Sequence, residues 1–177
     1  MKHLEVAEFI KIYNGLVENP NDHLMEEYVL SFPKCNSWYE TFKSMDLEPS
    51  TTNNCLVICP STERCTHFMK NAHHYFSKGK ILIGKLFSRH MKINEQVQFL
   101  KTRKPFINVG TPNRIFKILN STECLADIHW IFVDTSLDRK SLHILNLKDT
   151  QKDLLNIISL PNIHNSIKKG YAKIVLY

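Results

Sequence analysis

The chain has 177 residues, 43% of them apolar, which is enough for the core of one domain and leaves no room for a second full domain. No apolar run reaches the length of a membrane-spanning helix and residues 1–5 are too polar for a secretory signal, so we expect a soluble, intracellular protein. The net charge of +6 is uneven, because residues 1–54 carry 4 Lys/Arg and 9 Asp/Glu, whereas residues 55–177 carry 19 and 8.

The first third of the chain predicts a helix and an irregular segment. Residues 3–16 place apolar side chains at helical spacing and end before Asn19-Pro20, which favours an amphipathic helix. Residues 24–29 suggest a short second helix, the aromatic residues between 32 and 42 suggest a strap over the domain, and residues 49–54 form a polar loop. We therefore predict an N-terminal helix and acidic, aromatic strap, residues 1–54, packed on a domain of residues 55–177.

From residue 55 onward, segments typical of strands alternate with segments typical of helices. Residues 55–59 are a continuous apolar run, as expected for a strand buried on both faces of a parallel sheet. Ser61 or Thr62 then caps a helix that runs to about residue 76. Further strands are predicted at residues 80–83, 106–109, 130–134 and 172–177, and further helices at residues 94–101, 112–119 and 149–158.

This alternation predicts an α/β fold, with a three-layer, doubly wound, mainly parallel sheet and right-handed crossovers. In such sheets ligands bind beyond the carboxyl ends of the strands. The residues expected at those ends are Pro60, Ser61, Thr62, Gly110, Thr111, Asp134, Thr135 and Ser136.

The clearest site signal is the strand, turn and helix of residues 106–119. Gly110 lies in the turn, Thr111 is placed to cap the helix, Pro112 takes the first helical position, and Arg114 follows one turn later. The Thr111 hydroxyl, unpaired backbone N–H groups and the positive end of the helix dipole then converge at one point. This arrangement suits a phosphate group.

The same turn resembles part of a known enzyme family. Residues 109–115, Val-Gly-Thr-Pro-Asn-Arg-Ile, resemble the Thr-Pro-Gly-Arg motif by which DEAD-box RNA helicases grip the RNA backbone in their first RecA-like domain. Residues 60–64 resemble, more loosely, the Pro-Thr-Arg-Glu-Leu-Ala element, which also touches RNA phosphates, although an ordinary strand-to-helix turn explains them equally well. The resemblance implies a RecA-like fold and phosphate contacts by Ser61, Arg64, Gly110, Thr111 and Arg114.

The parts needed for ATP hydrolysis are missing from this pattern. Residues 79–85 match G-x-x-x-x-G-K, but Leu86 cannot hold a magnesium ion, and residues 81–83 are typical of a strand instead of a phosphate-binding loop. The position of the helicase Asp-Glu-Ala-Asp is occupied by Asp134-Thr135-Ser136, so Thr135 replaces the glutamate that orients the attacking water. We predict a degenerate ATP site, no enzymatic activity and a structural role for Asp134.

A one-sided basic segment precedes the turn. Residues 78–117 contain ten Lys/Arg and one acid, Glu95, which favours contact with nucleic acid, although lysines that merely solvate a helix face give the same pattern. No aromatic residues interleave with them, so base-specific recognition is not indicated. The residues of this segment expected to contact RNA phosphates are Lys85, Arg89, Lys101, Arg103 and Lys104.

Neither a metal ion nor a cofactor is predicted. The five cysteines lack close C-x-x-C pairs, which argues against disulfides and a zinc ribbon, so we expect reduced core residues. Cys65 and His67 lie two residues apart on a predicted helix and do not share a face. No Ser/His/Asp set has a nucleophile-elbow signature, so no catalytic residue and no small-molecule substrate is expected.

A closer resemblance joins several of these segments. Residues 85–92, Lys-Leu-Phe-Ser-Arg-His-Met-Lys, and residues 96–101, Gln-Val-Gln-Phe-Leu-Lys, together with residues 109–115, resemble the Cms-type ribosomal small-subunit assembly factors. This family is built on a single DEAD-box-like RecA domain without a Walker A motif. Asp134, Asp138, Lys140 and Asp149 fit its later pattern, whereas Asn113 replaces its usual glycine and its long charged N-terminal tail has no counterpart before residue 4.

The resemblance implies a non-catalytic ribosome biogenesis factor of the early small-subunit precursor, the processome, located in the nucleolus or nucleus. Its implied partners are pre-ribosomal RNA and small-subunit assembly proteins, and its implied process is rRNA processing. Two alternatives stay open from the sequence: a pure protein-protein adaptor without RNA contact, and a residual RNA helicase-like ATPase.

Overall fold

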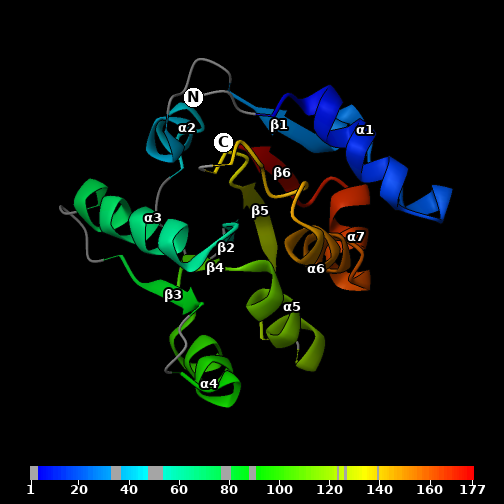
Figure 1. Cartoon of the computed structure of the whole chain (residues 1–177). Helices are drawn as coiled ribbons and strands as arrows, with labels where there is room; N and C mark the ends of the chain where they lie inside the picture. Colours follow the sequence, from blue (N-terminus) through cyan, green and yellow to red (C-terminus); the bar gives the residue numbers. More distant parts are fainter. Residues whose placement is uncertain are drawn as a thin grey trace.

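The protein is an α/β sandwich built on one parallel sheet (Figure 1). The computed structural model describes residues 4–32, 37–47, 54–76, 81–87, 91–122, 124–125, 127–138 and 140–177. Within these described residues, six strands pair in the order β1-β6-β5-β2-β4-β3, and each of these pairings is parallel. They are β1 (Val29–Ser31), β2 (Asn54–Ile58), β3 (Ile83–Leu86), β4 (Ile107–Gly110), β5 (Ile128–Val133) and β6 (Lys173–Leu176).

Helices cover both faces of the sheet and give the predicted three-layer, doubly wound fold. One face carries α2 (Trp38–Ser44) and α3 (Thr62–Tyr75), and Figure 1 shows these two helices on the side opposite α5, α6 and α7. The other helices are α1 (Val6–Leu16), α4 (Ile93–Arg103), α5 (Pro112–Ser121), α6 (Lys148–Ile158) and α7 (Pro161–Lys168). The described helices include none with the length and apolar character needed to cross a bilayer.

Side-chain alternation along the strands separates two hydrophobic cores. In β2, Leu56 and Ile58 pack with α1, α5, α6 and α7, whereas Cys55 and Val57 pack with α2 and α3. Phe132 of β5 lies on the second side and stacks on Phe42 of α2 with ring centroids 4.4 Å apart. Successive strand residues point to opposite faces, so a strand buried on both sides needs a continuous apolar run.

The segment before residue 54 contributes to both cores. Phe9 and Tyr13 of α1 are fully buried, as the helical spacing indicates. The short helix expected at residues 24–29 is instead a 3₁₀ turn, Glu26–Tyr28, that leads into β1. The predicted aromatic strap is helix α2, although residues 33–36 and most of the 49–54 loop lie outside the described residues.

Two further expectations need correction. The second strand was predicted at residues 80–83, but the structure places it at Ile83–Leu86, as β3. The reason is that Ile83 and Leu86 are buried in the two opposite cores, whereas Ile81 is only half-buried. Gly84 and Lys85 are therefore strand residues paired with Asn108 and Val109. Helix α7 follows α6 almost directly and was not predicted. Its eight residues are too few to show a clear helical pattern of apolar side chains.

The strands end in register, which defines the carboxyl edge of the sheet. Ile58 of β2 pairs with Gly110 of β4 on one side and Val133 of β5 on the other. Gly110 in turn aligns with Leu86, and Val133 aligns with Leu176. The turns after β2, β4 and β5 therefore emerge side by side.

One buried histidine makes the stability of this fold depend on pH. His143 is 8% exposed, and its Nδ1 accepts a hydrogen bond of 3.2 Å from the Leu145 backbone N–H, so the folded state holds a neutral ring. Burial lowers the His143 pKa, with an opposing effect from Glu8. Because the unfolded chain binds the proton more readily, the free energy of unfolding is expected to fall as pH drops below about 6.5, by at most about 1.4 kcal/mol per pH unit. Urea unfolding between pH 7.5 and 5 should show this decline, and His143→Asn should flatten it; an unchanged decline in the variant would assign the effect elsewhere.

Candidate nucleic-acid interface at the carboxyl edge

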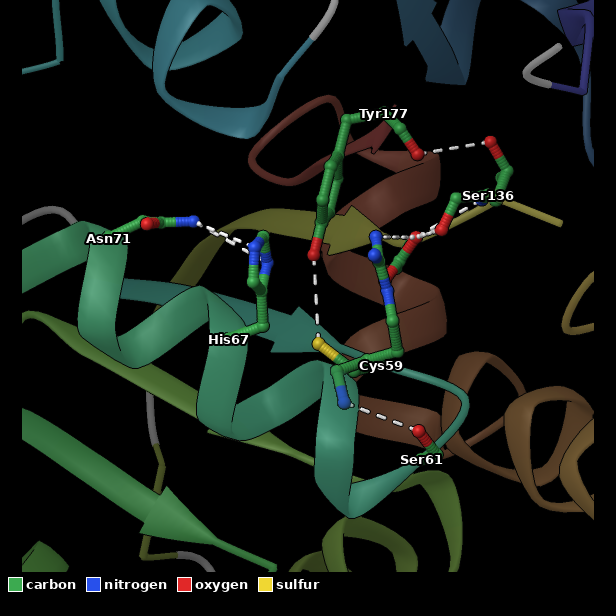
Figure 2. Close-up of polar contacts among 9 residues, drawn as sticks. Cys59, Ser61, His67, Asn71, Ser136 and Tyr177 are labelled. Atoms are coloured by element: carbon green, nitrogen blue, oxygen red, sulfur yellow. Dashed lines mark hydrogen bonds and ion pairs between the residues drawn. The ribbon is translucent and has the colours of Figure 1, made fainter. Parts of the chain in front are cut away.

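Helix α3 begins at the carboxyl edge, directly after β2. Ser61 is its N-cap, and the Ser61 hydroxyl accepts a hydrogen bond of 3.2 Å from the Arg64 backbone N–H, as shown in Figure 2. Ser61 is exposed, and the first helical N–H groups beyond the capped one have no intrahelical partner. The start of α3 therefore presents backbone donors and the positive end of a helix dipole to the outside.

Arg64 is directed inward and joins Asp134. Its Nε donates to Asp134 Oδ2 at 2.7 Å and its Nη2 donates to Asp134 Oδ1 at 3.1 Å. The carboxyl group is 1% exposed, and Oδ1 also accepts hydrogen bonds from the Ser136 backbone N–H, at 3.1 Å, and from the Ser136 hydroxyl. Burial lowers the pKa of Arg64, but the hydrogen bond and charge of Asp134 outweigh burial and raise that pKa overall. Each oxygen of Asp134 thus receives a protein donor.

A second set of buried contacts joins the end of β6 to the turn that follows β5. The backbone N–H and the hydroxyl of Thr135 both donate to the Tyr177 backbone carbonyl, at 2.8 and 3.1 Å. The Tyr177 ring reaches back over the sheet, and its hydroxyl lies 3.6 Å from Cys59 Sγ (Figure 2). Burial raises the pKa of both Cys59 and Tyr177, so both groups are neutral. Thr135 is fully buried at the position where the resembled helicases have a glutamate.

The turn after β4 has the geometry that the sequence predicts. Gly110 is packed so closely that a Cβ atom there would lie 2.5 Å from the Leu86 carbonyl oxygen. Thr111 is the N-cap of α5 in an extended conformation, with Pro112 at the first helical position. The Thr111 side chain makes no capping hydrogen bond, so its hydroxyl is not committed to the helix. Because β2 and β4 are neighbours in the sheet, the start of α5 lies next to the start of α3.

Arg114 lies one turn into α5 and fixes the start of α4. Its Nη1 donates to the Met91 carbonyl at 3.0 Å and to Gln96 Oε1 at 3.2 Å. Gln96 is 1% exposed, and its Nε2 donates to the Lys85 carbonyl of β3 at 2.6 Å. Gln96 thus connects β3, α4 and α5, a role that sequence reasoning missed. The available signal was a glutamine four residues before Leu100, on the buried face of an amphipathic helix.

The predicted basic residues divide between two edges of the sheet. Lys85 is exposed near the end of β3, and Lys92 is exposed at the start of α4, so both lie toward the carboxyl edge. Helix α4 returns the chain to the amino edge over about 16 Å, because it has 11 residues. Lys101, Arg103 and Lys104 are exposed at its far end, immediately before β4, and are not part of the carboxyl-edge cluster. Arg89 lies outside the described residues.

Comparison with known proteins decides the family. The family model described as CMS1, U3-containing 90S pre-ribosomal complex subunit, matches residues 19–177. The chain belongs to this family. The Cms-type resemblance inferred from residues 85–115 is thereby confirmed.

Curated relatives agree with the family match. Protein CMSS1 of Xenopus laevis is 25% identical over 162 residues, which cover 90% of this chain and 56% of that protein. Protein cms1 of Schizosaccharomyces pombe is 26% identical over 123 residues, covering 69% and 44%, and Protein CMSS1 of Homo sapiens is 24% identical over 147 residues, covering 82% and 50%. The chain spans about half the length of the curated relatives it matches.

Proposed function

We propose that this CMS1-family chain is a non-catalytic subunit of an early small-subunit pre-ribosome, where the carboxyl edge of its RecA-like sheet contacts pre-ribosomal RNA. The family description, a U3-containing 90S pre-ribosomal complex subunit, supports the assignment to ribosome biogenesis. It also supports a nucleolar or nuclear location, a part in rRNA processing, and assembly proteins as partners.

The observation that carries RNA contact is the pair of helix N-termini at adjacent strand ends. The pairing of Ile58 with Gly110 sets the α3 and α5 starts side by side, where Ser61 and the uncommitted Thr111 hydroxyl flank backbone N–H groups. Lys85 and Lys92 supply positive charge at the same edge. Backbone donors, a hydroxyl and flexible ammonium groups bind phosphate oxygens without reading bases.

The Arg64–Asp134 pair supports a non-catalytic role. In the resembled helicases the first aspartate after this strand positions magnesium. Here the Arg64 guanidinium group donates to both oxygens of the Asp134 carboxyl group. The negative charge that would bind a magnesium ion is therefore already paired with a protein cation. We infer that the RecA-like fold is retained for binding and the ATP site is degenerate.

Salt dependence of RNA binding tests the proposed surface. A fluorescent single-stranded RNA is titrated with the wild-type chain and two charge-matched variants, Lys85→Gln/Lys92→Gln at the carboxyl edge and Lys101→Gln/Arg103→Gln at the amino edge. Each lost phosphate contact lowers the slope of log affinity against log salt by about 0.7, so the first variant is expected to lose about 1.4 and the second to keep the wild-type slope.

Two other outcomes favour the alternatives. Equal slope losses in both variants would mean diffuse charge attraction without a defined surface, and no binding at low salt would favour a pure protein-protein adaptor.

A residual ATPase is tested separately by melting the chain with ATP and magnesium. A ligand that binds the native state must raise the melting temperature, so we expect no shift, and a clear rise would contradict the non-catalytic assignment.

A further inference from the structure

A cavity of about 240 Å³ lies at the amino edge of the sheet, on the opposite edge from the proposed RNA surface. It is bounded by the first residue of β5, Ile128, by Ala172 just before β6, and by one face of α7. Its lining residues are Leu125, Asp127, Ile128, Asn162, Ile163, Ser166 and Ala172. The cavity is large enough for one long side chain, and the mechanism proposed above does not use it.

The floor and the rim of this cavity differ in chemistry. Leu125, Ile128, Ile163 and Ala172 are all at most 8% exposed and form an apolar floor. Asp127 and Asn162 are exposed, and Ser166 is half-buried, so oxygen-bearing side chains face the opening. Within the described part of the chain, these three side chains have no hydrogen-bond or ion-pair partner.

Asp127 is the charged residue among the described residues that line the cavity. Its φ angle is +63°, in the left-handed region that aspartate and asparagine adopt more readily than most other residues. In a chain of net charge +6, the rim of the cavity thus presents an exposed carboxylate together with the oxygen-bearing side chains of Asn162 and Ser166.

An apolar floor with a carboxylate and neutral acceptors at the rim suits one side-chain type best. The arginine methylenes pack on apolar surface, while the planar guanidinium group donates in a fork to a carboxylate and to neighbouring oxygens. Arginine is also enriched among the few residues that dominate protein interfaces. We propose that this cavity binds an arginine side chain of a partner protein. The proposal does not depend on RNA contact at the carboxyl edge.

NMR titration of the whole chain tests this site. The probe is N-acetyl-arginine amide, compared with N-acetyl-citrulline amide, which has the same shape and no charge. We expect the arginine probe to shift the backbone amide signals of Asp127, Ser166 and Ala172 in a saturable way, with at least about tenfold weaker binding of the citrulline probe. The same titration is repeated with Asp127→Asn, which removes the charge while asparagine still accepts the left-handed backbone.

Asp127→Asn is expected to weaken arginine binding about tenfold, with unchanged amide signals elsewhere as the check on folding. Asp127→Gly, which relieves the backbone and also removes the carboxylate, should weaken it equally. Equal binding of both probes, full affinity in Asp127→Asn, or shifts confined to residues away from the cavity would each overturn the proposal. The RNA titration tests the carboxyl edge and the arginine titration tests the cavity at the amino edge, so either proposal can fail without affecting the other.

Discussion

Arg64→Met is expected to lower the free energy of unfolding by about 3 kcal/mol, because it leaves the Asp134 carboxylate buried without its cation. The Ser136 donors remain, but they do not replace a guanidinium group that binds both oxygens. For a chain of this size the loss corresponds to a fall in melting temperature of roughly 6–12 °C. Urea unfolding at pH 7 measures the free energy directly.

A double-mutant cycle separates this ion pair from lost packing. Asp134→Asn alone should cost about 1 kcal/mol less than Arg64→Met, since the half-exposed Arg64 can turn toward solvent. Arg64→Met/Asp134→Asn should be more stable than Arg64→Met, because no buried charge is left alone. If the stability losses of the two single variants simply add in the double variant, Arg64 and Asp134 do not stabilise each other.

Gly110→Ala is expected to cost about 3 kcal/mol, because the last residue of β4 has no space for a side chain. The new Cβ atom would lie 2.5 Å from the Leu86 carbonyl oxygen, 2.6 Å from Leu86 Cβ and 2.9 Å from Ile115 Cγ1. Two of these atoms belong to β3 and one to α5, so relief requires β3 and α5 to separate. Affinity for RNA should fall with stability, because the α5 start moves.

Two other glycines provide matched controls. A Cβ atom at Gly15, in α1, meets no atom within 4 Å, so Gly15→Ala should stabilise the chain by about 0.5–1 kcal/mol. At Gly84 the new Cβ would meet the side-chain oxygen of the buried Asn108 and lie 3.1 Å from Pro105 Cγ. Both contacts are with side chains and not with the backbone, so Gly84→Ala is expected to cost less than Gly110→Ala. Equal losses at Gly84 and Gly110 would contradict the expectation that the backbone contact of Gly110 with Leu86 is the more costly of the two.

Much of this fold could be predicted from the sequence because its signals are local. The apolar run of β2, the Ser61 cap of α3 and the Gly110-Thr111-Pro112 turn each follow from neighbouring residues, and the structure confirms all three. The strand β1 and the helix α7 were missed. β1 has only three residues and is fixed by pairing with β6, a contact between residues almost 150 positions apart that no local pattern encodes.

The candidate site was predictable in part, for the same reason. The sequence places Arg64, Lys85 and Lys101 near phosphate-suited turns, but it does not show which way a side chain points or at which edge a helix ends. The structure turns Arg64 toward Asp134, 70 residues away, and carries Lys101 to the opposite edge along α4. Gln96 was missed because its importance comes from contacts with Lys85 and Arg114 in two other elements.

The central claim is that the carboxyl edge touches RNA inside a pre-ribosome. It is tested most directly by photo-crosslinking particles that contain thiouridine-labelled RNA and this chain, followed by mass spectrometry of nucleotide-bearing peptides. We predict nucleotide adducts on peptides that contain residues 60–64 and 106–114. Adducts confined to residues 101–104, or none from a chain that co-purifies with the particle, would contradict the claim and point to a protein-binding adaptor.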